Sequence, residues 1–376
     1  MSVFTVFFCG TGSNSFDPLN NSYWNGELVS TLASNMNSKE FADWVVIDGP
    51  GSGNLQADAL FTEPKGYGLS GTLFGKGWEE NVAHAVSIIK GKTTWERTEL
   101  SKQNYERLKS AGVEIPDAEK QSGWLWRTYF YGERKVTQQA LQEQIIKVFR
   151  KGGIIPTQVN IVGWSRGGVS CHMLANAMLA DPQLKDIPVN IFAIDPVPGL
   201  LNFQKHRVTL GANVKQYVGF YARDERSKGF ACVTPQTTPG TLVNIFPFVG
   251  RHATLVGNAA ADGANGAKAF IEPGLIIRHY AEQCLTRWGA SLDKKLNLTT
   301  AQIDEHLRKI SKDEDAYIKM RKHSYTLLTE DTKGDRSVSL ADKGIGFGDV
   351  SGAQFQPVAG LSAPMAPVHT YHKPIS

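Results

Sequence analysis

The sequence lacks several features that would assign it to a functional class at once. Its four cysteines, among 376 residues, form no C-x-x-C pair, so neither a zinc site nor a disulfide scaffold is indicated. Basic residues exceed acidic ones by only 40 − 36 = 4, an excess too small over this length to predict nucleic-acid binding. No apolar run reaches the ~18 residues that a membrane-spanning helix needs. The N-terminus carries no basic stretch and no small-residue cleavage site, so we expect a chain made in the cytoplasm without a signal peptide.

What is present is an ordinary globular composition, with 41% hydrophobic and 20% charged residues. Such a chain has enough apolar surface to offset its conformational entropy, which excludes a disordered or collagen-like protein. The length indicates one large α/β domain with insertions, or two domains. The glycine pair Gly10 and Gly12 matches neither G-x-G-x-x-G nor the P-loop, so no nucleotide cofactor is expected. No metal site is expected either, since the cysteine spacing matches none.

Apolar runs that end at glycine alternate with amphipathic stretches through the first two thirds of the chain. Continuous apolar runs are typical of strands buried on both faces, and apolar residues spaced three or four apart predict helices. The order strand–helix–strand predicts an α/β fold, a mostly parallel, α/β-hydrolase-like sheet with helices on both faces. We expect strands at 3–8, 44–47, 159–162, 189–194, 216–221 and 241–246, and helices at 77–89, 136–148 and 169–179.

The chain changes character after about residue 256, where we expect the strands to stop. Helices are predicted at 273–288 and 300–325, the second opened by a capping box of Thr299 with Gln302. The last ~35 residues are rich in Gly, Pro, Ser and Ala and predict extended or loosely ordered chain. We therefore divide the chain into a catalytic domain, 1–257, and a helical and irregular C-terminal region, 258–376, packed on it. The aromatic stretch within 92–132 is a candidate lid or membrane-contact insertion, since Trp and Tyr favour lipid interfaces.

The sharpest local motif is G-x-S-x-G at Gly163–Gly167, between a predicted strand and a predicted helix. In this setting the serine occupies a strained turn that lifts its hydroxyl above the sheet, and glycines allow backbones to pass closely. Ser165 is therefore the candidate nucleophile. The Arg166 N–H, at the start of the helix, and the N–H groups of Thr11 and Gly12 are candidate oxyanion donors.

A nucleophilic serine needs a histidine base and a carboxylate that orients it. Among the histidines after the elbow, only His252 directly follows an apolar strand, so it is the candidate base. Two aspartates end strands between the serine and the histidine. Asp224 lies in the loop just before the histidine strand, which is the usual place for the acid, and we favour it. Asp195, one strand earlier, is the alternative.

Six segments recur here in the order of a known family, at residues 7–14, 48–53, 163–168, 194–197, 222–230 and 246–252. Together they resemble the catalytic domain of type VI secretion lipase effectors, the Tle group, and related microbial α/β-hydrolase domains. The resemblance covers roughly residues 3–257. Cys9 stands where the family has an acidic residue, and Ala253–Gly257 replaces the family's S-D-V-G-G.

The resemblance implies Ser165 as nucleophile, Asp224 as acid and His252 as base. It further implies a phospholipid substrate, transient contact with a membrane surface and export by a type VI system into rival bacteria. A cognate immunity protein and a component of the secretion machine are the implied partners. From the residues alone, a non-lipid esterase or thioesterase fits equally. The other alternative is a non-enzymatic hydrolase-fold protein that binds a lipid or protein partner.

Overall fold

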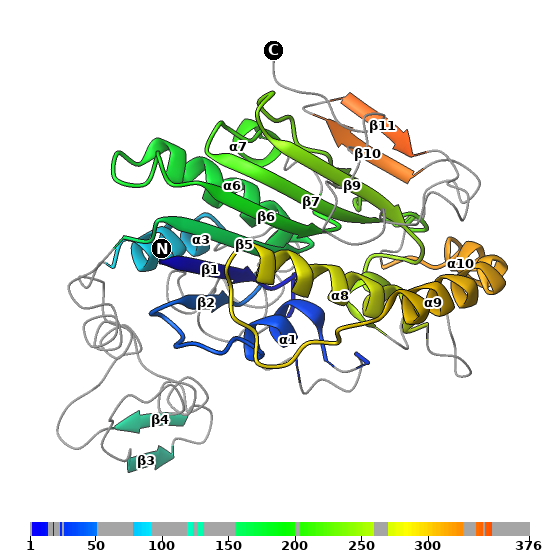
Figure 1. The fold of residues 1–376 in the computed structure, drawn as a ribbon, viewed down its shortest axis with the longest axis horizontal. Coiled ribbons are helices and arrows are strands. Elements are labelled where there is room, and N and C mark those ends of the chain that lie inside the picture. Colours follow the sequence, from blue (N-terminus) through cyan, green and yellow to red (C-terminus); the bar gives the residue numbers. More distant parts are fainter. Residues whose placement is uncertain are drawn as a thin grey trace.

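The fold was analysed in a computed structural model of the chain (Figure 1). The expected helix at 136–148, and most of the candidate lid at 92–132, lie outside the described residues. The structure describes residues 2–13, 18, 23–24, 26–50, 78–91, 119–122, 127–130, 155–199, 204–258, 270–325, 336–340 and 343–347.

A six-stranded sheet in which all neighbours are parallel forms the centre of the molecule. Its strand order is β2-β1-β5-β6-β7-β9. The predicted α/β class and parallel sheet are thus confirmed, and three expected strands have the predicted bounds. The strands are β1 (Val3–Phe8), β2 (Trp44–Ile47), β5 (Gln158–Trp164), β6 (Val189–Ile194), β7 (Val214–Ala222) and β9 (Leu242–Phe248).

Helices cover both faces of this sheet, because successive side chains of each buried strand point to opposite faces. In β1, Phe4, Val6 and Phe8 join one hydrophobic core and Phe7 joins the other. The first core is closed by α3 (Trp78–Ile89) and α6 (Arg166–Ala180). The second is closed by α1 (Leu28–Ser34) and α8 (Glu272–Arg287) (Figure 1).

The C-terminal helices differ in one respect from the expectation. Thr299 and Gln302 form the predicted capping box at the start of α9 (Thr300–Lys312). A single helix to residue 325 was expected, but the helix ends at Asp313 and α10 (Glu314–Met320) begins there. Tyr317 and Met320 of α10 are buried in the second core, so packing of α10 against the sheet side redirects the chain.

Strands do occur after residue 256, contrary to the expectation. The strand β10 (Arg336–Leu340) pairs antiparallel with β11 (Lys343–Phe347) and parallel with β8 (Cys232–Val233). The pairing partner is a two-residue strand in a loop, which no apolar periodicity reveals. The loops also hold η3 (Thr254–Val256), α7 (Lys205–Val208) and a hairpin of β3 (Glu119–Ser122) with β4 (Arg127–Phe130).

None of the four cysteines forms a disulfide, as their spacing predicts, and all four are buried. Within the described ranges, no helix is both long and apolar enough to cross a membrane.

Candidate functional site

The candidate site lies at the carboxyl edge of the sheet, where β1 and β5 are neighbours. From β1 the chain leaves through α1 to β2 on one side, and from β5 it leaves through α6 to β6 on the other. The two connections cover opposite faces, so a topological switch point lies between the ends of β1 and β5. Such a switch point is where open α/β sheets bind ligands. Thr11 follows β1 and Ser165 follows β5 at this point.

Ser165 occupies a strained turn between the last residue of β5 and the first residue of α6. Its φ of 59° and ψ of −127° are uncommon for a residue with a side chain. A Cβ on Gly163 would lie 2.2 Å from the Gly167 carbonyl oxygen, and one on Gly167 would lie 2.2 Å from the Phe8 carbonyl oxygen. The two glycines therefore let β5, α6 and β1 approach closely. The Ser165 side chain makes no cap for α6, and the turn has the geometry of a nucleophile elbow.

Backbone hydrogen bonds fix this turn to the loop after β6. The Ser165 N–H donates to the Ile194 carbonyl at 3.0 Å, and the Val197 N–H donates to the Ser165 carbonyl at 3.2 Å. Asp195, between these two partners, has a positive φ of 42°. The structure thus places Asp195 next to the elbow and turns its backbone out of the strand direction.

His252 contacts Asp195. Its Nδ1 lies 2.5 Å from Asp195 Oδ2, and both residues are buried. The Trp164 ring, directly before Ser165, lies 5.1 Å from the imidazole, and the Phe230 ring lies at the same distance in an edge-on orientation. The backbone N–H of His252 donates to Glu225 Oε2 at 3.2 Å. The backbone hydrogen bond and the two rings therefore hold the imidazole against the Asp195 carboxylate.

Asp224, the favoured acid of the sequence analysis, is bound elsewhere. Its carboxylate accepts from Arg223 Nε at 3.0 Å, from Arg321 Nε at 2.8 Å and from the Gly250 N–H at 2.9 Å. Two guanidinium groups and a backbone N–H thus bind this buried carboxylate. The contact with His252 is made instead by Asp195, the alternative.

A buried arginine completes the surroundings of Asp195, and no sequence motif indicates it. Arg336 of β10 donates through Nη1 to Oδ1 and through Nη2 to Oδ2, the latter at 2.9 Å. The Ala222 N–H donates to Oδ1 at 3.0 Å. Burial raises the pKa of Asp195, but the charge of Arg336 and the hydrogen bond from His252 outweigh it and hold the pKa below its usual range. Asp195 is therefore ionised at neutral pH.

The loop after β1 is less open than the sequence indicates. The Gly12 N–H donates to the Pro50 carbonyl at 3.1 Å, so this expected oxyanion donor is already in use. The Thr11 hydroxyl accepts from Arg166 Nη1 at 3.2 Å. Burial, and then the charge of Arg207, lower the Arg166 pKa to about 10, so the side chain is still a cation at neutral pH. The side chain of Arg166, the first residue of α6, thus ties that helix to the loop after β1.

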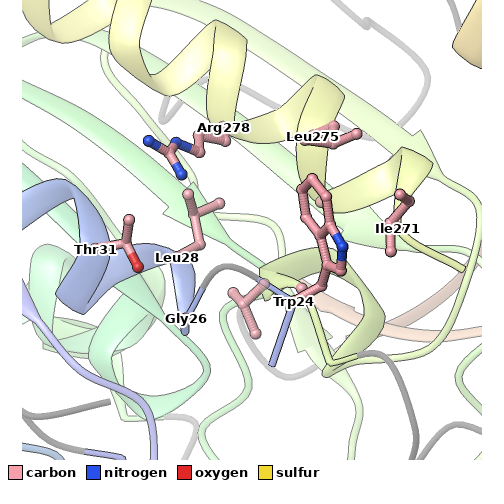
Figure 2. Close-up of a pocket in the computed structure, with 10 residues that line it drawn as sticks. Trp24, Gly26, Leu28, Thr31, Ile271, Leu275 and Arg278 are labelled. Atoms are coloured by element: carbon pink, nitrogen blue, oxygen red, sulfur yellow. The ribbon is translucent and has the colours of Figure 1, made fainter. Parts of the chain in front are cut away.

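In the part of the chain that the structure describes, this geometry is accompanied by a small pocket and by no group of metal ligands. Across the described ranges, no three His, Cys, Asp or Glu side chains are grouped so that they could hold a metal ion. A pocket of about 20 Å³ lies between α1, α8 and the segment after His252 (Figure 2). Trp24, Leu28 and Leu275 line it, with Arg278 at its side. Its volume suffices for about one water molecule, so it does not by itself accommodate a substrate.

Comparison with known proteins gives distant structural similarity only. No protein-family model and no curated protein matches the sequence. The crystal structure of an uncharacterized protein from Pseudomonas aeruginosa aligns with a TM-score of 0.48 and 13% identity over 85% of this chain and 52% of that one. The structure of the Tle1 effector bound to the VgrG spike of the Type 6 secretion system aligns with a TM-score of 0.32 and 14% identity. That alignment covers 70% of this chain and 52% of the other. The chain therefore spans about half the length of both.

Proposed function

We propose that the protein is a serine hydrolase that cleaves carboxylic esters through an acyl-enzyme. The observation that carries the proposal is the 2.5 Å contact of His252 Nδ1 with the ionised Asp195, formed next to a serine in elbow geometry. A carboxylate on Nδ1 fixes the tautomer in which Nε2 can accept a proton. Nucleophile, base and orienting acid are then Ser165, His252 and Asp195, with Asp195 in place of Asp224.

The reaction follows the general order of acyl transfer. His252 Nε2 takes the proton of the Ser165 hydroxyl while the oxygen attacks the ester carbonyl. The carbonyl oxygen becomes an oxyanion, which we assign to the N–H of Arg166 and the N–H of Thr11. The imidazolium, stabilised by Asp195, then protonates the leaving alcohol. Water, deprotonated by His252, attacks the acyl carbon; the bond to Ser165 Oγ breaks, the imidazolium returns its proton to this oxygen, and the acid leaves.

A phospholipid is the proposed substrate, on the strength of the six motifs in family order. The described surface agrees with an apolar substrate. Trp24 and Tyr325 are two of the few large apolar side chains exposed on it, and they flank the segment that follows His252. The Trp24 N–H donates to the Gly257 carbonyl at 2.7 Å, and the Ala253 N–H donates to the Tyr325 hydroxyl at 3.1 Å. Exposed aromatic rings beside the segment that follows His252 are suited to contact with a lipid surface.

The biological setting belongs to the same proposal. The Tle1 structure shows that effector on a VgrG spike, and a spike protein of this kind is the proposed carrier here, with an immunity protein protecting the producing cell. Delivery through a type VI system and the division into a catalytic part, 1–257, and a C-terminal part, 258–376, are also proposed. A role as a lid is likewise proposed for residues 92–132.

Labelling with a fluorophosphonate probe tests the chemistry directly. We expect the wild type to be labelled and Ser165→Ala to be unlabelled. Ser170→Ala is the matched control, since Ser170 is buried one turn further along the same helix, and it should be labelled like the wild type. A folded wild type that reacts no faster than Ser165→Ala would exclude the enzyme and leave the non-enzymatic binding protein. Mass spectrometry of phospholipids and simple esters incubated with the protein then identifies the substrate class.

A further inference from the structure

Arg336 is the least expected residue near the candidate site. It begins β10, 141 residues after Asp195 in sequence, yet its side chain is 1% exposed. Besides both oxygens of Asp195, its guanidinium donates to the Ala222 carbonyl at 2.6 Å and to the Phe230 carbonyl at 2.9 Å. Pairing of Val338 with Cys232, between β10 and β8, fixes the strand that carries it.

These contacts join the three parts that hold the imidazole. Ala222 ends β7 and supplies a second donor to Asp195 through its N–H. Phe230 packs its ring edge-on against His252. One guanidinium therefore fixes the carboxylate, the strand end behind it and the backbone of the residue that packs on the base. A planar fork with several donors is suited to this, whereas a single ammonium group is not.

We propose that Arg336 is the positioning residue of the site: it holds the Asp195 carboxylate against His252 Nδ1 and neutralises part of the carboxylate charge. The inference rests on the proposed serine-hydrolase function. It makes β10, in the C-terminal region, part of the catalytic apparatus. Arg336 touches no reacting atom and acts only through Asp195 and the residues around His252.

The charge balance around the pair sets the expected effect. Titratable groups from four elements interact with Asp195. They are His252 from the segment after β9, Arg336 from β10, Tyr217 and Tyr221 from β7, and Cys232 from β8. Glu225, beside Arg251, lies on the backbone side of His252 and acts on Arg336 through its charge. Burial raises the pKa of Cys232 to about 12, and it raises the pKa of both tyrosines. At neutral pH the groups nearest Asp195 thus include one permanent cation, Arg336.

The pH dependence of probe labelling at Ser165 tests the inference. In Arg336→Gln the Asp195 carboxylate keeps the Ala222 N–H and His252 as partners but loses its cation, so its charge acts more strongly on the imidazole. We expect the acidic limb of the labelling rate to move to higher pH by about one to two units, the size of shift that a neighbouring charge produces. Arg336→Lys keeps the positive charge but loses the paired hydrogen bonds of the guanidinium group to both Asp195 oxygens. Its limb should stay within about 0.5 unit of wild type while the limiting rate falls about tenfold.

Arg321→Gln is the matched control, a buried arginine of the C-terminal region paired with a buried aspartate. Asp224 keeps Arg223 in this variant, so its acidic limb should coincide with that of wild type. If Arg336→Gln is folded and its limb also coincides with wild type, the inference is wrong. If the wild type is not labelled at all, the proposed function itself fails, which is a distinct result.

A second measurement covers the case in which Arg336→Gln does not fold. Asp195→Asn with Arg336→Gln replaces an ion pair by a neutral pair, so no unpaired charge is buried. Because Arg336 acts through Asp195, the double variant should be labelled within about threefold of Asp195→Asn alone. A further tenfold loss in the double variant would show that Arg336 acts independently and would overturn the inference.

Discussion

Replacement of Asp195 by asparagine removes one charge and changes one hydrogen-bonding atom. In the structure Oδ1 accepts from the Ala222 N–H and from Arg336 Nη1, whereas Oδ2 faces His252 Nδ1 and Arg336 Nη2. An asparagine that keeps its oxygen at the Oδ1 position conflicts with one donor, Nη2. The reversed orientation conflicts with two. We therefore expect the amide NH₂ to face His252 Nδ1.

An NH₂ group in that position turns Nδ1 into an acceptor and leaves the proton on Nε2. This tautomer of His252 cannot take the proton of Ser165. The expected loss is about 10⁴ in kcat, as for the same change in a serine protease triad, which corresponds to about 5.5 kcal/mol of transition-state stabilisation. The KM should change little, because Asp195 is fully buried and does not reach substrate.

Hydrolysis of p-nitrophenyl esters, normalised to the folded protein, measures this loss. The control is Asp224→Asn, which breaks buried ion pairs with Arg223 and Arg321 and should lower the free energy of unfolding by about 3–5 kcal/mol. Its turnover per folded molecule should remain within about tenfold of wild type, as expected for a change away from the reacting groups. An Asp195→Asn protein with wild-type turnover, beside an inactive but folded Asp224→Asn, would refute the assignment.

Three further predictions concern stability, each measured by urea unfolding. Burial lowers the pKa of His172 to about 4 from 6.5, so the unfolded chain binds this proton first as the pH falls. The contribution of His172 to the free energy of unfolding is complete above pH 6.5 and is lost as the pH falls from 6.5 to 4. The loss is about 3 kcal/mol, at about 1.36 kcal/mol per pKa unit. His172→Phe should therefore flatten this part of the pH profile of stability. Gly167→Ala places a Cβ against the Phe8 carbonyl and should cost about 3 kcal/mol; an unchanged midpoint would contradict the close approach. Thr299→Ala removes the capping-box acceptor and should cost about 1 kcal/mol at an unchanged m-value.

The sequence predicts those parts of the fold that rest on short-range patterns. Apolar runs define β1, β2 and β6 to the residue because both faces of these strands are buried. The capping box is equally local, since it joins Thr299 to Gln302. The end of α9 at Asp313 has no such signal. It depends on packing of Tyr317 and Met320 in the second core, which is a tertiary effect.

The candidate site divides in the same way. Ser165 and His252 are each proposed from local sequence: a strand precedes both, and glycines flank the serine. The choice of the acid has no such local basis, because both aspartates end a strand and their side-chain partners come from distant parts of the chain. The adjacent Arg223 was the one local indication against Asp224. Arg336 has no local indication at all, because its role depends on strand pairing across more than a hundred residues.

The partners of the two buried aspartates explain why Asp195, and not Asp224, suits the proposed role of orienting His252. Asp224 is bound by arginines and a backbone N–H, none of which exchanges a proton near neutral pH. Asp195 shares its carboxylate between the permanent cation Arg336 and the titratable His252. It can therefore respond when the imidazole gains a proton, while the arginine keeps it ionised. The C-terminal region supplies an arginine to each aspartate, Arg321 to one and Arg336 to the other. Removal of this region would leave two carboxylates in the interior with fewer counter-charges, at a cost of several kcal/mol each. The energetics thus tie residues beyond 257 to the sheet that carries Ser165.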